Sequence, residues 1–225
     1  MRWSRLSWNK PVATWNLWID GCGGFQVISS SSLFARIGRP LAGSSGETAV
    51  PRIEVLADLP EVAGELSFGD AGYQWRPEES PRHSELISLP PANTGGWSGR
   101  LEIGSVRLEI CVPSTASRTG RMTVATPHRF ADHVDAVILM DRAISIGPTA
   151  QHPIRHPGIH DWYVLHPPTH ATDDPQAEKP DSWRLRRPAD GTSVQLVPGR
   201  RSVVEELSLM IEPCRRAPHF QNHRV

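Results

Sequence analysis

Residues 106–112 read Val-Arg-Leu-Glu-Ile-Cys-Val, and an apolar side chain occupies every second position. Arg107, Glu109 and Cys111 stand between them. Successive side chains of an extended strand point to opposite faces, so this alternation places the apolar ones on a single face. A strand with one buried and one exposed face is typical of an antiparallel sheet. The segment therefore predicts a β-strand that covers a hydrophobic core.

Segments of similar length recur along the chain, about 8–12 residues apart. Each is rich in β-branched or aromatic residues and is bounded by turn-forming residues such as Gly and Pro. We expect the following strands: 15–19, 25–28, 33–37, 52–56, 64–68, 73–76, 85–89, 99–103, 106–112, 122–125, 136–140, 143–146, 162–165, 183–186, 193–197 and 206–211. Many short strands with few helices predict an all-β sandwich.

Composition agrees with many short elements joined by turns. The 225 residues include 18 glycines and 21 prolines, and 38% of the residues are hydrophobic. Eight tryptophans argue against disorder, because disordered chains are poor in aromatic residues. We expect most of these tryptophans, Trp162 among them, to pack in a core or between repeats. The length suits one large domain or two small ones.

The charges balance, with 24 basic and 24 acidic side chains. Without a net charge there is no global field to attract nucleic acid or an acidic membrane, so we expect neither as a partner. Cys22, Cys111 and Cys214 are few and widely spaced, which predicts neither a zinc knuckle nor a disulfide framework. Together with an N-terminus unlike a signal peptide, this indicates a reducing compartment, and we expect a cytoplasmic protein.

Two pairs of segments resemble each other across the chain. Residues 33–40 match 142–148 in residue type, and 106–110 match 207–211. Gly38 and Gly147 are 109 residues apart, while the second pair is offset by 101. Similar offsets in the same order predict an internal duplication, with chance likeness between short strands as the alternative.

The duplication divides the chain into two expected domains, residues 12–113 and residues 122–213. The polar segment between them, Pro-Ser-Thr-Ala-Ser-Arg-Thr-Gly at 113–120, is typical of a linker. We expect residues 214–225 to form a disordered tail.

Four segments follow one another in the order of landmarks known from one family: Ile37–Arg39, Leu56–Leu59, Gly64–Leu66 and Gly99–Gly104. In this order they resemble a forkhead-associated (FHA) domain over roughly residues 14–113, with a weaker echo over 123–213. The resemblance implies two tandem sandwiches of the SMAD/FHA type. It also implies a protein-interaction module without enzymatic activity or cofactor, whose end loops bind phosphothreonine peptides.

Gly38 and Arg39 match the family's Gly-Arg, and the resemblance makes them the phosphopeptide-binding candidates. Arg suits a dianionic phosphate because its hydrogen bonds are charge-assisted. However, the family's Ser and His fall at Pro60 and Ala63, and the Glu61 carboxylate would repel phosphate. In the second repeat Pro148 stands in place of the Arg. The resemblance thus implies a degraded site and another protein, phosphorylated or not, as partner; retained phosphopeptide binding through Arg39 is one alternative.

Five histidines fall close together, which leaves a second alternative open: His152, His156, His160, His166 and His170. Imidazoles are common ligands of zinc, copper and nickel. Yet Pro153, Pro157 and Gly158 interrupt any helix that would align them. A metal-dependent enzyme using the cluster, with His156 and His160 as ligands, is this alternative. The leading expectation has no metal, no cofactor and no catalytic residue.

Overall fold

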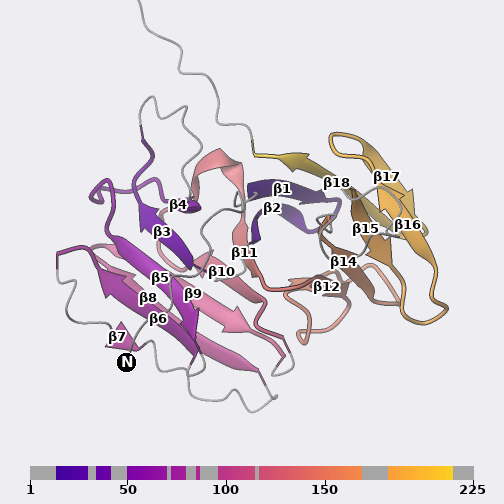
Figure 1. The fold of residues 1–225 in the computed structure, drawn as a ribbon, viewed down its shortest axis with the longest axis horizontal. Coiled ribbons are helices and arrows are strands. Elements are labelled where there is room, and N and C mark those ends of the chain that lie inside the picture. Colours follow the sequence, from indigo (N-terminus) through magenta and orange to yellow (C-terminus); the bar gives the residue numbers. More distant parts are fainter. Residues whose placement is uncertain are drawn as a thin grey trace, which may run out of the picture.

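The computed structural model describes residues 14–29, 34–41, 50–69, 72–79, 85–86, 96–114, 117–168 and 182–214. Within them the chain forms eighteen β-strands and one 3-10 turn, Ala131–His133, and the described residues contain no α-helix (Figure 1). The predicted all-β class is therefore confirmed. None of the three cysteines forms a disulfide.

The first nine strands are β1 (Thr14–Ile19), β2 (Gly23–Ser29), β3 (Phe34–Gly38), β4 (Arg52–Glu54), β5 (Gly64–Gly69), β6 (Gly72–Pro77), β7 (Glu85–Leu86), β8 (Trp97–Ile103) and β9 (Val106–Val112). The other nine are β10 (Gly120–Val124), β11 (Ala136–Met140), β12 (Ile144–Gly147), β13 (Ile154–Arg155), β14 (Tyr163–His166), β15 (Trp183–Arg186), β16 (Ser193–Leu196), β17 (Arg201–Val204) and β18 (Leu207–Pro213).

These strands form three sheets. An eight-stranded sheet has the order β17-β18-β1-β2-β11-β10-β9-β8, and its pairs are antiparallel except for the central pair β2–β11, which is parallel. The two others have five strands each, in the orders β4-β3-β5-β6-β7 and β13-β12-β14-β15-β16. In Figure 1 the first lies on the left and the second on the right, with β1, β2 and β11 between them.

Two hydrophobic cores lie on opposite faces of the eight-stranded sheet. Along β11, Val137 and Leu139 belong to the first core, whereas Ala136, Ile138 and Met140 belong to the second. Because side chains alternate along a strand, the two cores must lie on different faces. Each core is closed by one of the five-stranded sheets, so each lies between two packed sheets, as in a β-sandwich.

The second nine strands have the same pairing pattern as the first nine. In both sets the first two strands pair with each other, as do the last two. The five-stranded sheets also agree in order and in strand direction. The register agrees as well, since Ile37 pairs in parallel with Ile53 as Ile146 does with Ile154. The segments that resemble each other in sequence thus occupy corresponding strands, β3 with β12 and β9 with β18.

The predicted domain boundaries, 12–113 and 122–213, do not coincide with the two cores. The hairpin β1–β2 lies between β18 and β11, and it places Leu17, Ile19, Phe25 and Val27 in the second core. Conversely, β10 pairs with β9 and contributes Met122 to the first core. The first hairpin of each nine-strand set therefore pairs with the last strand of the other set. Alternation within a strand does not specify its partner, which is why the sequence did not show this exchange.

The expected tail begins at Cys214, whose backbone N–H still donates a hydrogen bond to the carbonyl of Thr14 (3.0 Å). Residues 215–225 lie outside the described part of the chain. None of the helical structure in the described part has the length and apolar character needed to cross a membrane.

Candidate functional site

Gly38, the first candidate residue, ends β3 at a close approach of two backbone segments. A Cβ at this position would overlap the carbonyl oxygen of Glu61, so only Gly lets the β4–β5 loop pack here. The Gly38 carbonyl accepts a hydrogen bond from the N–H of Val55 (2.9 Å). The close packing of this loop thus explains why a Gly occupies position 38.

Arg39 follows Gly38 and is exposed. Its backbone N–H donates to the carbonyl of Pro60 (3.0 Å), which ties the end of β3 to the β4–β5 loop. Within the described residues its guanidinium makes no hydrogen bond or ion pair. Among the described residues, no partner therefore competes with an external anion for this side chain.

Arg52, at the start of β4, points inward and is only 8% exposed. Its Nη2 donates to the carbonyl oxygens of Glu61 (2.7 Å) and Arg39 (3.3 Å), and its Nε lies 3.6 Å from a carboxylate oxygen of Glu54. A buried cation needs such partners, because desolvation otherwise disfavours its charge. Arg52 therefore braces the loops instead of adding a second phosphate ligand.

The β4–β5 loop has no side-chain donors at the positions that the family resemblance assigns to Ser and His. Pro60 and Glu61 are exposed, and Ala63 donates only its backbone N–H, to the carbonyl of Ile37 (2.8 Å). Residues 88–91, where the family would have an Asn, lie outside the described part of the chain. In this region the candidate anion site consists of the exposed guanidinium of Arg39, and the loop beside it carries the exposed carboxylate of Glu61.

The corresponding end of the second sandwich keeps the backbone geometry. The Gly147 carbonyl accepts a hydrogen bond from the N–H of His156 (2.8 Å), as Gly38 does from Val55. A Cβ on Gly147 would overlap the ring of His152. Pro148 replaces the Arg, so this end has no cation at the position of Arg39.

At this end of the second sandwich, Arg187 is surrounded by carboxylates from neighbouring loops. Arg187 forms ion pairs with Asp190, Glu205 and Asp161, the last at 3.7 Å. Hydrogen bonds from Arg187 and then from Thr192 lower the pKa of Asp190, so it stays ionised. Three carboxylates against one guanidinium would repel a phosphate. These loops of the second sandwich are thus a poorer phosphate site than the end of β3 in the first.

The histidines proposed as metal ligands have separate partners. His156 is buried, with Nε2 3.0 Å from the carbonyl oxygen of Asp20 and Nδ1 accepting from the N–H of Gly158 (3.1 Å). Both ring nitrogens are therefore engaged, which leaves none for a metal. His160 is exposed, with Nδ1 2.8 Å from a carboxylate oxygen of Glu206, and its hydrogen bond lowers the pKa of Glu206.

His152 and His166 lie apart from that pair. The His152 ring stacks on Trp162, with centroids 5.7 Å apart and planes at 28°, and burial lowers the pKa of His152. His170 lies outside the described residues. Among the described residues, no three His, Cys, Asp or Glu side chains are grouped so as to hold a metal ion. The metal-enzyme alternative thus finds no support there.

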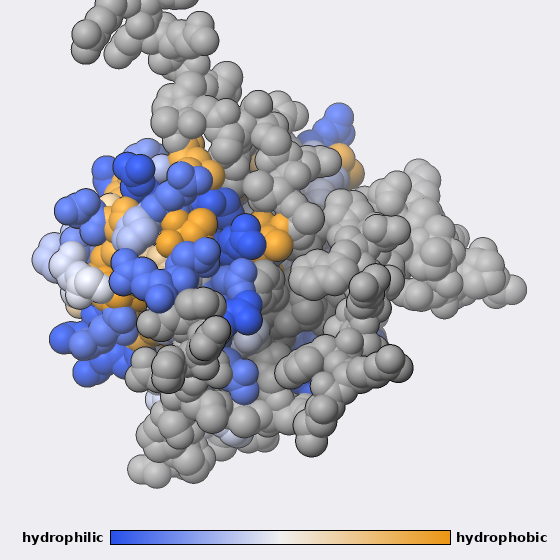
Figure 2. Space-filling model, turned by 60° about the vertical axis from the view of Figure 1, so that its left-hand side comes forward, coloured by the Kyte–Doolittle hydropathy of each residue, from blue (hydrophilic) through white to orange (hydrophobic). Residues whose placement is uncertain are grey.

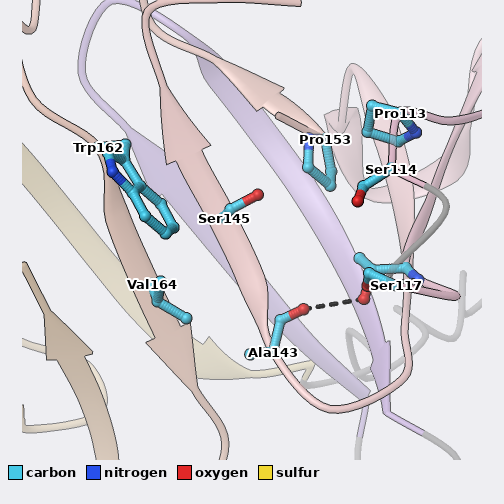
Figure 3. A pocket seen from close by; sticks show the side chains of 9 residues that line it. Pro113, Ser114, Ser117, Ala143, Ser145, Pro153, Trp162 and Val164 are labelled. Carbon is cyan, nitrogen blue, oxygen red and sulfur yellow. Dashed lines mark hydrogen bonds between the residues drawn. The ribbon is translucent and has the colours of Figure 1, made fainter. Parts of the chain in front are cut away.

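An open cavity of about 190 Å³ lies where the linker between β9 and β10 crosses the second five-stranded sheet (Figure 3). Figure 3 shows Trp162 and Val164 beside Ser145 on one side, with Pro113 and Pro153 on the other. The linker is held in place because Thr119 Oγ1 donates to the carbonyl of Ala143 (2.8 Å). The lining residues are Pro113, Ser114, Ser117, Thr119, Ala143, Ser145, Pro153, Trp162 and Val164.

Sequence reasoning missed this cavity. Trp162 was expected in a core or between repeats, yet it is 41% exposed. The linker residues that line the cavity lie far from Trp162 in the sequence, so no local motif could reveal it. Figure 2 views the molecule from the side of the first sandwich. Among the coloured residues of this face, hydrophilic ones predominate, and apolar ones form small separate areas.

Comparison with protein-family models, with curated proteins and with solved structures finds no match for this chain.

Proposed function

We propose that this chain is a non-enzymatic protein-interaction module of two tandem FHA-like repeats, with a degraded phosphothreonine site, that binds another protein in the cytoplasm. The duplication is supported by the matching pairing pattern of the two nine-strand sets. The FHA-like reading is supported by the position of Gly38–Arg39, where β3 ends against the β4–β5 loop.

The geometry around Arg39 supports the proposal that the phosphothreonine site is degraded. Arg39 is exposed, Arg52 is turned inward, and the loop offers Pro60 and Ala63 where hydroxyl and imidazole groups would be needed. One charge-assisted hydrogen bond contributes roughly 1.5–3 kcal/mol. Micromolar affinity requires about 8 kcal/mol. Arg39 by itself therefore falls well short of a working phosphopeptide site.

Affinity capture from the native cell tests the proposal. The full chain is the bait, with and without phosphatase treatment of the lysate, and the heat-unfolded chain is the control. We expect a specific protein that is captured equally under both conditions. Capture of no protein would contradict the interaction function. A partner that is lost both after phosphatase treatment and with Arg39→Ala would instead show that phosphopeptide binding is retained.

A further inference from the structure

The outer face of β14 carries a row of side chains that differs from its counterpart in the first sandwich. Ser145 on β12 pairs with Val164 on β14, which pairs with Arg186 on β15. Leu165 and Leu185, the neighbours of Val164 and Arg186 along their strands, are buried in the core. Because side chains alternate along each strand, the row of three points away from the core.

The corresponding row of the first sandwich is Arg36, Glu65 and Arg76, on β3, β5 and β6. Arg36 precedes Gly38 by two residues, as Ser145 precedes Gly147. The Glu65 carboxylate forms ion pairs with both arginines, with Arg36 at 3.3 Å. In this row one carboxylate therefore lies between the two arginines and pairs with both.

The second sandwich keeps one of these arginines but not the carboxylate. Arg186 corresponds to Arg76, and Val164 stands where the first sandwich has Glu65. A second Arg, Arg184, pairs with His166 in the next row. Within the described residues neither Arg186 nor Arg184 makes a hydrogen bond or ion pair. Two cations thus lie side by side on this face, and neither has an acidic partner among the described residues.

The apolar cavity adjoins the two cations. Val164, the cross-strand neighbour of Arg186, is one of its walls, and the exposed Trp162 is another. Its volume of about 190 Å³ is below the roughly 300–1,000 Å³ of small-molecule sites. It therefore suits one apolar side chain better than a cofactor. The cavity wall is mostly apolar, and both Thr119 Oγ1 and Ser117 Oγ already form hydrogen bonds.

We propose that this β14 face, defined by Trp162, Val164, Arg184 and Arg186, is the surface through which the chain binds its protein partner. The partner presents an acidic segment with one apolar side chain, which enters the cavity while flanking carboxylates pair with the two arginines. The inference rests on the proposed interaction function and names the surface and the partner chemistry. Charge complementarity selects the acidic segment, because covering unpaired cations without carboxylates would be unfavourable.

The probe is a fluorescein-labelled peptide in which one leucine is flanked by glutamates, and binding to the full chain is followed by fluorescence anisotropy. Three companion peptides replace the leucine by glycine, the glutamates by glutamine, or the glutamates by lysine. We expect the first peptide to bind, and each companion to bind at least about tenfold more weakly, a difference of about 1.4 kcal/mol. Raising the salt concentration should weaken binding, because the cations are exposed.

Variants locate the binding on this face. Val164→Glu restores the carboxylate that the first sandwich has at Glu65, so it should fold normally while weakening binding at least about tenfold. Trp162→Ala and Arg186→Ser should weaken it as well. The matched control is Arg76→Ser, the corresponding change in the first sandwich, which should leave binding unaltered. Thermal melting followed by circular dichroism verifies that each variant is folded.

Several results would overturn the inference: no binding of the leucine–glutamate peptide, unaltered binding by folded Val164→Glu and Trp162→Ala, or tighter binding of a single-stranded oligothymidylate. The capture experiment separates this failure from failure of the proposed function. A native partner retained by Val164→Glu would leave the interaction function standing and refute the β14 face. Capture of no partner by the unaltered chain would refute the interaction function itself.

Discussion

Arg39 presents its guanidinium to solvent at the end of β3, whereas the nearby Arg52 is engaged with backbone carbonyls. We predict that phosphothreonine peptides bind at millimolar concentrations or above, because one charge-assisted contact is too weak for tighter binding. Fluorescence anisotropy with a degenerate phosphothreonine peptide library measures this. Arg39→Ala should leave the fold intact, since the side chain is exposed.

The matched control for Arg39 is Arg100→Ala, because Arg100 is an exposed Arg on β8 that pairs with Glu109 (3.2 Å). A low-micromolar peptide whose binding is lost in Arg39→Ala and kept in Arg100→Ala would refute the degraded site.

A second single residue, His166, should make the stability of the protein depend on pH. Burial, followed by the charges of Arg186 and Arg184, lowers its pKa in the folded protein. Its unfolded pKa is about 6.5. As the pH falls through that value the unfolded chain takes up the proton first, so the protein loses stability on acidification. We predict that His166→Gln loses less free energy of unfolding than the unaltered protein between about pH 7.5 and about pH 5.5.

Urea unfolding at the two pH values measures this difference. Burial lowers the pKa of His152 too, so the pH slope should decrease without vanishing. Replacing Arg184 and Arg186 by Gln should raise the pKa of His166, which NMR titration of the imidazole follows. A pH slope of stability that is unaltered in His166→Gln would contradict the prediction.

The hairpin β1–β2 tests how the two sets of strands are joined. It begins the first set, but its side chains Leu17, Ile19, Phe25 and Val27 pack in the second core. Phe25 is 2% exposed in that core. We predict that Phe25→Ala destabilises the protein by about 3–5 kcal/mol. Hydrogen exchange should then increase more in β12, β14 and β18 than in β3, β5 and β6.

Ile53→Ala is the matched control for Phe25→Ala, because Ile53 is fully buried in the first core. It should produce the reverse pattern of exchange. If Phe25→Ala instead loosened chiefly β3, β5 and β6, the exchange of hairpins between the two sets would be wrong.

At the scale of the whole molecule, the shared eight-stranded sheet couples the two cores. Neighbouring residues of β11 serve different cores, Ile138 the second and Leu139 the first. We predict a single unfolding transition in urea, with coincident curves from far-UV circular dichroism and tryptophan fluorescence. The folded spectrum should be that of an all-β protein. Two separated transitions would mean that the cores unfold independently.

Most strands were predictable because alternation and turn residues are local properties. The buried face of β9 follows directly from Val106, Leu108 and Ile110, all nearly inaccessible in the structure. Two strands were missed. β13 has only two residues, and β17 lacks an apolar face, with Val203 69% exposed. For the candidate site, the sequence predicted Gly38 and Arg39 but not the inward turn of Arg52, which depends on the folded positions of the Glu61 and Arg39 carbonyls.

The sequence by itself determined where the chain extends and where it turns. Gly21 and Gly23, for example, adopt positive φ in the β1–β2 turn, as glycines between two strand-like segments allow. Only the tertiary structure decided which strands pair, as when Trp15 meets Pro213 across the chain. It also decided that Val164 and Trp162 form one cavity with the linker. The reason is physical: alternation specifies which side chains are buried, whereas backbone hydrogen bonds between strands are the same for any partner.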